Sequence, residues 1–219
     1  MSLYTLKPRF QALLRPAVRV VHGLGVTANQ VTLGACAGSV VLGTGLALAA
    51  DAGQVTWFLL LPVWFLLRMA LNAIDGMLAR DFGQRSTLGA YLNELADPVS
   101  DAALYLPFAY LPEGNVPLTM LVIFLANLAE TAGVLGLTTA SSRRNDGPLG
   151  KSDRALVFGV AGLLVGAGIA PGSWSSWSSW TSWTSWLSWL LSVVALLLLV
   201  TIANRVRRGV ADDGISIRP

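Results

Sequence analysis

Charged residues are scarce in this chain, and their scarcity excludes most soluble folds. Asp, Glu, Lys and Arg make up 12% of the 219 residues, about half the share found in a typical soluble domain. Hydrophobic residues make up 54%, and they recur in runs of about 20, the length that spans a bilayer as a helix. Backbone groups in lipid must pair internally, in helices or a closed barrel. Because strand-like alternation is absent, we expect an all-α, polytopic membrane protein.

Cysteine and histidine are almost absent as well. The single Cys36 cannot pair within the chain and has no neighbours at metal-ligand spacing, so a disulfide framework and a thiolate metal centre are excluded. We interpret the single His22 as an interfacial side chain rather than a ligand. Residues 1–20 lack the apolar core and small-residue cleavage site of a secretion signal. The net charge of +3 does not suggest a nucleic-acid partner.

Six apolar segments predict six transmembrane helices behind an N-terminal interfacial helix. Residues 1–24 combine apolar positions at helical spacing with basic residues, the pattern of an amphipathic helix on anionic headgroups. Pro8 and Pro16 argue against one unbroken helix there. The motif VTANQVT at 26–32 indicates a helix start. The spans are expected at 31–50, 55–74, 88–111, 117–138, 155–170 and 185–203. Together they form one six-helix domain at 25–203, before a loosely ordered charged tail at 204–219.

The basic residues predict the orientation in the membrane. With the N-terminus inside and six spans, all 15 Lys and Arg residues fall on one side. The opposite loops at 51–54, 112–116 and 171–184 contain none. The positive-inside rule then places both termini and the charged stretch described below in the cytoplasm.

A tryptophan repeat precedes the last span. Six Trp residues occupy every third position between 174 and 189, with Ser and Thr between them. A period of three spreads these rings around a helix of 3.6 residues per turn instead of stacking them. We interpret the segment as a linker at the outer membrane surface, where Trp is enriched, rather than as an aromatic ligand box.

The stretch Asn72–Asp101 holds seven of the 27 charged residues and crosses from the second span into the third. A charge within a membrane helix costs about 2.5–3.5 kcal/mol on insertion scales, so such a cluster indicates a functional site. Asn72 and Asp75 share one helix face. A second face carries, at steps of four, Gly89, Asn93, Asp97 and Asp101. Oxygen side chains facing each other from two helices favour Mg²⁺ or Mn²⁺ and the phosphates these ions bridge.

Small and basic residues in the same stretch suit a phosphate ligand. Gly76 and Gly89 leave room for a bulky group near the backbone, and Arg80 offers a planar fork of donors to a phosphate. The residues therefore indicate transfer of a phosphate-containing group at the membrane surface. A polar helix pair that only packs the bundle is the alternative.

These residues resemble the signature of the CDP-alcohol phosphotransferase family, D-x2-D-G-x2-A-R-x8-G-x3-D-x3-D. At those positions, without any insertion, the chain has Asn72, Asp75, Gly76, Ala79, Arg80, Gly89, Asn93 and Asp97. Ser86, the six spans and VTANQVT, which is similar to the family's T-P-N-x-x-T, also fit. The likeness covers most of the chain, and it is closest to a bacterial branch of unassigned acceptor with Asn at the first and third aspartate positions.

The resemblance implies a phosphatidyltransferase of phospholipid biosynthesis in the bacterial inner membrane. Such an enzyme transfers the phosphatidyl group of CDP-diacylglycerol to an alcohol and releases CMP. The family's metal positions, which would bind Mg²⁺ or Mn²⁺, are here Asn72, Asp75, Asn93 and Asp97. The nucleotide and its phosphates would contact Asn29, Thr32, Asp75, Gly76, Ala79, Arg80, Ser86 and Gly89.

The resemblance also implies roles in the acceptor step. Asp97, at the last aspartate position, would be the general base on the acceptor hydroxyl. Lys151 and Arg154 resemble the family's basic group around a phosphorylated acceptor, although ordinary positive-inside residues are an equal alternative. Glu130, within the fourth span, is either a polar contact in the acceptor cavity or a protonated packing residue.

Asn72 and Asn93 depart from the family pattern because an amide oxygen ligates a cation without contributing negative charge. Asp75 and Asp97 alone balance one divalent cation. Three outcomes follow: one tight and one weak metal, recruitment of Asp101 or Glu94 as replacement ligands, or loss of catalysis in a protein that still binds CDP-lipid. A working site with altered metal binding is favoured because Asp75, Arg80 and Asp97 are retained.

Two other classes of function compete with the enzyme. A non-catalytic CDP-lipid-binding protein would keep the pocket without the chemistry. A divalent-cation transporter would use the acids for transport, but the internal repeats and broken helices of transporters are absent. The resemblance also implies membrane lipids as partners, and it allows a second copy of the chain as a partner in a homodimer.

Overall fold

The computed structural model describes residues 7–112, 114–139, 142–169 and 185–216. Throughout these ranges the regular structure is helical, without strands. Its elements are α1 (Lys7–Gly23), α2 (Ala28–Asp51), η2 (Val55–Leu59), α3 (Leu60–Asp81), α4 (Thr87–Tyr105), η3 (Leu106–Tyr110), α5 (Val116–Thr139), α6 (Lys151–Gly166) and α7 (Trp186–Ser216). The prediction for the tryptophan repeat falls mostly on 170–184, outside the described residues.

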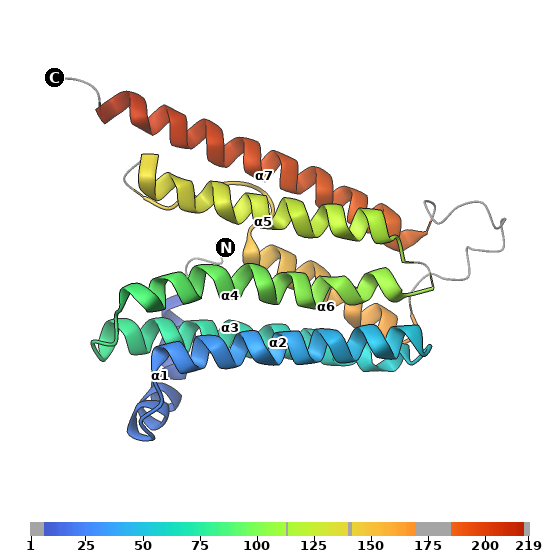
Figure 1. The fold of residues 1–219 in the computed structure, drawn as a ribbon, viewed down its shortest axis with the longest axis horizontal. Coiled ribbons are helices and arrows are strands. Elements are labelled where there is room, and N and C mark those ends of the chain that lie inside the picture. Colours follow the sequence, from blue (N-terminus) through green and yellow to red (C-terminus); the bar gives the residue numbers. More distant parts are fainter. Residues whose placement is uncertain (1–6, 113, 140–141, 170–184, 217–219) are drawn as a thin grey trace.

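Helices α2 to α7 run back and forth between the two ends of an elongated bundle (Figure 1). The α3–α4 turn, the α5–α6 loop and the C-terminal end of α7 lie at one end, on the left of Figure 1. The α2–α3 and α4–α5 connections lie at the other end. Basic loops of the sequence therefore gather at one end, as the orientation argument requires, and the side of the membrane they face stays a prediction.

Four segments are long and apolar enough to cross a membrane: Ala28–Asp51, Val55–Asp81, Val116–Thr138 and Trp186–Ala211. The other two predicted spans do not reach this standard among the described residues. Helix α4 carries Glu94, Asp97 and Asp101. Helix α6 has 16 residues, which span about 24 Å at 1.5 Å per residue. Six spans stay a prediction, and four are supported by length and composition.

The start of α2 confirms the helix signal in VTANQVT. Thr27 is the N-cap, and its hydroxyl accepts from the backbone N–H of Gln30 at 3.3 Å. The Gln30 side chain accepts from the Thr27 N–H at 2.9 Å, which completes a capping box. The cap fixes the point at which α2 begins after α1 and enters the bundle.

Two predictions about the extent of helices are wrong. Helix α1 is one helix with Pro16 inside it; the carbonyl of Ala12 that loses its partner belongs to an exposed residue, where solvent can satisfy it. Residues 204–216 are not a loosely ordered tail, because α7 continues to Ser216. Arg205 is buried and donates to the backbone oxygen of Ala129, which ties this extension to α5.

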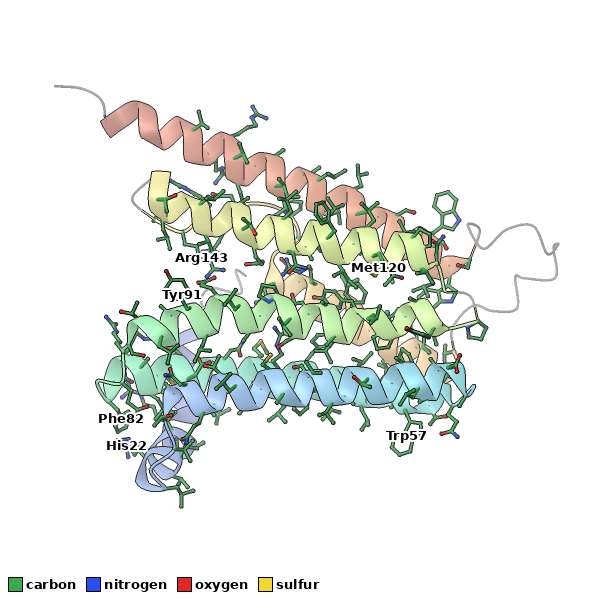
Figure 2. All side chains as sticks on the ribbon, viewed as in Figure 1. His22, Trp57, Phe82, Tyr91, Met120 and Arg143 are labelled. Carbon is green, nitrogen blue, oxygen red and sulfur yellow. The ribbon has the colours of Figure 1, made fainter. Side chains whose placement is uncertain are left out.

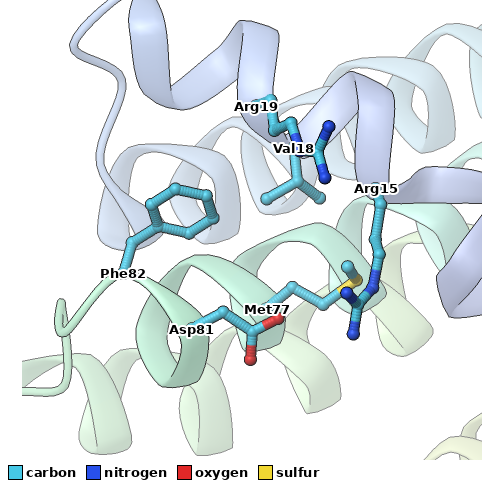
Figure 3. A pocket seen from close by; sticks show the side chains of 6 residues that line it. All are labelled: Arg15, Val18, Arg19, Met77, Asp81 and Phe82. Atoms are coloured by element: carbon cyan, nitrogen blue, oxygen red, sulfur yellow. The ribbon is translucent and has the colours of Figure 1, made fainter.

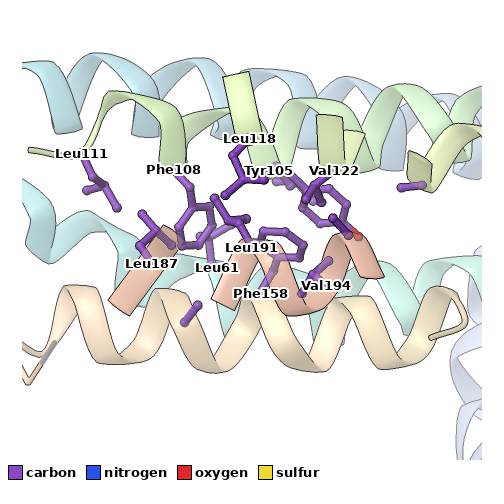
Figure 4. Close-up of a cluster of buried hydrophobic side chains, with 14 of the residues drawn as sticks. Leu61, Tyr105, Phe108, Leu111, Leu118, Val122, Phe158, Leu187, Leu191 and Val194 are labelled. Atoms are coloured by element: carbon purple, nitrogen blue, oxygen red, sulfur yellow. The ribbon is translucent and has the colours of Figure 1, made fainter. Parts of the chain in front are cut away.

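The larger apolar cluster lies between helices α2 to α7, and a smaller one joins α1, α2 and the end of α3. Phe108 packs edge-on against Phe58 and Phe158, with ring centroids 5.4 and 5.3 Å apart. Tyr105 stacks on Phe158 at 3.9 Å. Figure 4 shows Phe108, Phe158 and Leu191 meeting from η3, α6 and α7. This core fixes α4 and α6 against each other, and so sets where their polar ends meet.

Helices α2 and α4 approach closely at Gly43. A Cβ at this position would lie 2.1 Å from the backbone oxygen of Ala103, far inside van der Waals contact. Only glycine allows this separation, so Gly43 sets how closely α2 and α4 pack.

Candidate active site

Asp75 is held on α3 by a residue from α2. The carboxylate is buried, and its Oδ2 accepts from the hydroxyl of Thr32 at 2.8 Å. The same hydroxyl lies 3.1 Å from the Ala28 carbonyl, one turn earlier. The carboxylate also accepts from the backbone N–H of Gly76, so these two donors leave the negative charge of a buried group without a charged partner. Asp75 is therefore suited to a further positively charged partner.

Asp97 on α4 faces α3 and the start of α6. Its Oδ1 accepts from Nη2 of Arg68 at 3.2 Å and from Nδ2 of Asn72 at 3.3 Å. Its Oδ2 forms an ion pair with Lys151 Nζ. Asn93 is half-buried one turn earlier on α4. The structure thus brings the predicted residues Asn72, Asp97 and Lys151 into direct contact.

Asp101 lies one turn deeper and has different partners. Arg68 Nη1 donates to its Oδ1, and Arg154 Nη2 donates to its Oδ2 at 3.0 Å. Both oxygens of this buried carboxylate are engaged by guanidinium groups. In these contacts Asp101 is a counter-ion to two arginines, as Asp97 is to Arg68 and Lys151, and its role as a replacement metal ligand stays a prediction. The predicted alternative, Glu94, is likewise paired with an arginine, Arg143.

The residues predicted to contact the nucleotide converge near the α3–α4 turn. A Cβ at Gly89 would lie 2.7 Å from Oδ1 of Asn29 and 3.0 Å from Oγ of Ser86. Ser86 caps α4 by accepting from the Gly89 N–H at 2.9 Å. Gly89 is therefore required for Asn29 and Ser86 to approach each other.

The α3 side of this region carries Gly76, Ala79 and Arg80. A Cβ at Gly76 would lie 3.0 Å from Nη1 of Arg80, so the arginine folds back over the glycine. Ala79 is half-buried beside it. Gln84, between α3 and α4, connects this region to the start of α2, because its Oε1 accepts from the Ala28 N–H at 2.7 Å.

A separate small pocket lies between α1 and the end of α3. It has a volume of about 170 Å³ and is lined by Arg15, Val18, Arg19, Met77, Asp81 and Phe82. Figure 3 shows the two arginines on the α1 side and Asp81 with Met77 on the α3 side. None of the residues predicted to bind the nucleotide or metal lines it. The pocket lies where α1 packs against the end of α3.

Glu130 is the centre of a network of arginines. Its Oε2 accepts from Arg143 Nη2 and its Oε1 from Arg154 Nη2, each at 3.0 Å. Arg205 Nη1 lies 3.7 Å from Oε1. In Figure 2, Arg143 lies between α4 and α5, where it pairs with both Glu94 and Glu130. Three guanidinium groups around one carboxylate do not fit the interpretation of Glu130 as a protonated packing residue.

Arg68 is the site residue whose role the sequence did not reveal. It is buried on α3 and joins Asp97 to Asp101. The signal was available: Arg68 falls within an apolar span, where a buried arginine needs an anionic partner. It stands four residues before Asn72, on the same face of α3.

The donor set fits one divalent cation. Among the described residues, no three acidic, histidine or cysteine side chains gather as a metal site. The two carboxylates of Asp75 and Asp97, with the amide oxygens of Asn72 and Asn93, nevertheless make an all-oxygen set of the kind that Mg²⁺ and Mn²⁺ prefer. The two carboxylates carry a formal charge of −2, which matches one such ion, and Asp97 also pairs with Arg68 and Lys151.

The fold and these contacts define a membrane-embedded helical protein with a charged site at one end of its bundle. The family model of the CDP-alcohol phosphatidyltransferases matches residues 25–202. The chain belongs to this family.

Several known proteins are similar to the chain. Inner membrane protein YnbA of Escherichia coli is 52% identical over 165 residues, which cover 75% of this chain and 81% of that protein. Phosphatidylinositol phosphate synthase of Corynebacterium glutamicum is 28% identical over 177 residues, 77% of each chain.

Solved structures of Mycobacterium tuberculosis phosphatidylinositol phosphate synthase share the fold at 18% identity. One is a complex with manganese and citrate, with a TM-score of 0.67 over 93% of this chain and 92% of that chain. Another has CDP-DAG bound, with a TM-score of 0.66 over 93% and 96%.

Proposed function

We propose that this protein is a metal-dependent phosphatidyltransferase that takes CDP-diacylglycerol and an alcohol and releases CMP. The proposal is carried by the approach of Asn72 and Asp75 on α3 to Asp97 on α4, in a chain of the CDP-alcohol phosphatidyltransferase family. Manganese and CDP-DAG are bound by a protein of the same fold. A site of this kind needs ligands for a cation, groups that contact the phosphates and a base, and the proposed residues offer each of these.

Asp75, Asp97, Asn72 and Asn93 would hold the cation. When bound, the ion neutralises charge on the phosphates and so favours attack at phosphorus. Thr32 fixes one oxygen of Asp75 through its 2.8 Å hydrogen bond. Because Asn72 is hydrogen-bonded to Asp97, the two helices present their ligands in a fixed relation. Pre-organised ligands of this kind bind a metal more tightly than mobile ones.

The nucleotide side is assigned to Asn29, Ser86 and Gly89 together with Gly76 and Arg80. The glycine at position 89 lets the Asn29 amide approach the backbone of α4, since a Cβ there would lie 2.7 Å from its Oδ1. The nucleotide would therefore meet the Asn29 amide and the Ser86 hydroxyl close to each other. Arg80 is exposed at the end of α3, where its guanidinium can contact a phosphate.

Asp97 is assigned the role of general base. The acceptor hydroxyl forms a new O–P bond at the phosphatidyl phosphorus, the P–O bond to CMP breaks, and the hydroxyl proton passes to a carboxylate oxygen of Asp97. A general base must reach the proton at hydrogen-bond distance. Lys151 and Arg68, which pair with Asp97, keep that carboxylate in place between α3 and α6.

The test is CMP release from radiolabelled CDP-diacylglycerol by the purified protein with Mn²⁺ or Mg²⁺ and a panel of alcohols. We expect release that requires the metal and disappears in Asp97→Asn. Asp51→Asn is the matched control, and it should retain wild-type release. Asp51 is the exposed last residue of α2, and α2 ends at the opposite end of the bundle (Figure 1). If no alcohol supports release while the nucleotide still binds, the protein is a CDP-lipid binder and the proposal is wrong.

A further inference from the structure

The cations on the predicted acceptor side are paired with carboxylates. Lys151 pairs with Asp97, and Arg154 pairs with Asp101 and Glu130. Arg143, from the α5–α6 loop, pairs with Glu94 and Glu130. The basic residues that resemble a phosphate-binding group are therefore held within an ion-pair network that links α3, α4, α5 and α6.

Burial decides which members of this network a ligand can reach. The side chain of Arg154 is 0% exposed, and Arg205 is also buried, so neither can contact an incoming molecule directly. The reachable cations of the network are Lys151 and Arg143, with side chains 32% and 29% exposed. Beside them, Glu94 is 34% exposed. An approaching ligand that reaches Arg143 thus meets the carboxylates of Glu94 and Glu130, which already pair with it.

A phosphate group is a poor ligand for such a surface. It would have to displace Glu94 or Glu130 from Arg143, and the displaced carboxylate would then stand beside the phosphate. Like charges brought together at a binding surface cost several kcal/mol. A hydroxyl group is uncharged, so the glutamates do not repel it. It can accept a hydrogen bond from Lys151 or donate one to a glutamate without breaking the network.

We propose that Glu94 and Glu130 are specificity-determining residues that make the acceptor an alcohol without a phosphate group. This inference rests on the proposed phosphatidyltransferase function and narrows its substrate class. Glu130 neutralises Arg143 from the buried side, and Glu94 does so from the exposed side. Both glutamates act on the acceptor's charge and neither takes part in the attack at phosphorus.

The experiment compares glycerol with glycerol 3-phosphate in wild type, Glu94→Gln and Glu130→Gln. The first measurement is the ratio of CMP release rates with the two acceptors. We expect wild type to prefer glycerol and each glutamine variant to shift the ratio toward glycerol 3-phosphate by about tenfold, the equivalent of 1.4 kcal/mol. The control is Asp146→Asn, which removes the same charge from a pair with Arg208 outside the network and should leave the ratio unchanged.

A second measurement does not depend on turnover. Thermal unfolding in detergent is followed with glycerol 3-phosphate or glycerol alone, without CDP-diacylglycerol. Glycerol 3-phosphate should raise the unfolding temperature of both glutamine variants and leave that of wild type unchanged. Because Glu94 is partly exposed and Arg143 keeps Glu130, Glu94→Gln should fold even if Glu130→Gln does not.

The two measurements separate this inference from the proposed function. If no protein releases CMP with any acceptor, the proposed function fails, and the unfolding measurement still decides the inference. The inference is wrong if wild type uses glycerol 3-phosphate as well as glycerol or is stabilised by it. It is also wrong if neither glutamine variant gains a response to glycerol 3-phosphate.

Discussion

Replacing Asp101 distinguishes a counter-ion from a metal ligand. Asp101 is 5% exposed and accepts from Arg68 and from Arg154, whose side chain is fully buried. Removing one partner of a buried ion pair leaves an uncompensated charge and costs about 3–5 kcal/mol. Arg68 keeps Asp97 and Arg154 keeps Glu130, so we expect Asp101→Ala to fall at the lower end of that range. Asp101→Asn should cost less, because the amide oxygen can still accept one hydrogen bond.

The assay is denaturant unfolding in mixed micelles, followed by a Mn²⁺ titration of the folded protein. Both Asp101 variants should lose stability while the midpoint of the Mn²⁺ titration stays at its wild-type value. Asp146→Ala is the control, because its partner Arg208 is 68% exposed and exposed pairs contribute about 0–1 kcal/mol. Unchanged stability together with markedly weaker Mn²⁺ binding in Asp101→Asn would refute the reasoning and return Asp101 to the metal site.

Three further substitutions test the packing and the site. Gly43→Ala should destabilise the fold by about 1–3 kcal/mol, because its Cβ would overlap the Ala103 backbone. Gly45→Ala should not destabilise it, because nothing lies within 4 Å of a Cβ there. Chemical unfolding of the two variants compares their stabilities. Thr32→Val removes the donor to Asp75 and should weaken Mn²⁺ binding about tenfold, the value of one hydrogen bond to a charged group; unaltered affinity in a titration would mean that Thr32 does not position the ligand. Gly89→Ala should raise KM for CDP-diacylglycerol more than it lowers kcat, because it intrudes on Asn29 and Ser86, while Gly34→Ala, which faces open space, should behave as wild type in initial-rate measurements.

The sequence predicted the helical class and the family because both depend on local patterns. Runs of apolar residues locate α2, α3, α5 and α7 within a few residues of where the structure has their apolar parts. The capping motif located the start of α2, because Thr27 and Gln30 lie within one turn. The signature residues lie within 26 consecutive positions, so their spacing alone brings them to two facing helices.

The ion-pair network could not be predicted in the same way. Arg143, Arg154 and Arg205 are far from Glu130 or on other helices, and only the tertiary packing brings them together. From the sequence we predicted that Arg205 belongs to a charged cytoplasmic tail. In the structure it is buried and donates to the Ala129 backbone of α5, so it is part of the bundle. Spacing placed Asp101 on the same face of α4 as Asn93 and Asp97, but it could not show that Arg68, one turn before Asn72 on α3, donates to Asp101.

The most direct test of the account is the mass of the lipid formed from CDP-diacylglycerol and a non-phosphorylated alcohol in the presence of Mn²⁺. We predict a phosphatidyl ester of that alcohol in amounts equal to the CMP released, and no product from Asp97→Asn. Formation of phosphatidic acid alone, or of no lipid product while CDP-diacylglycerol remains bound, would contradict the account.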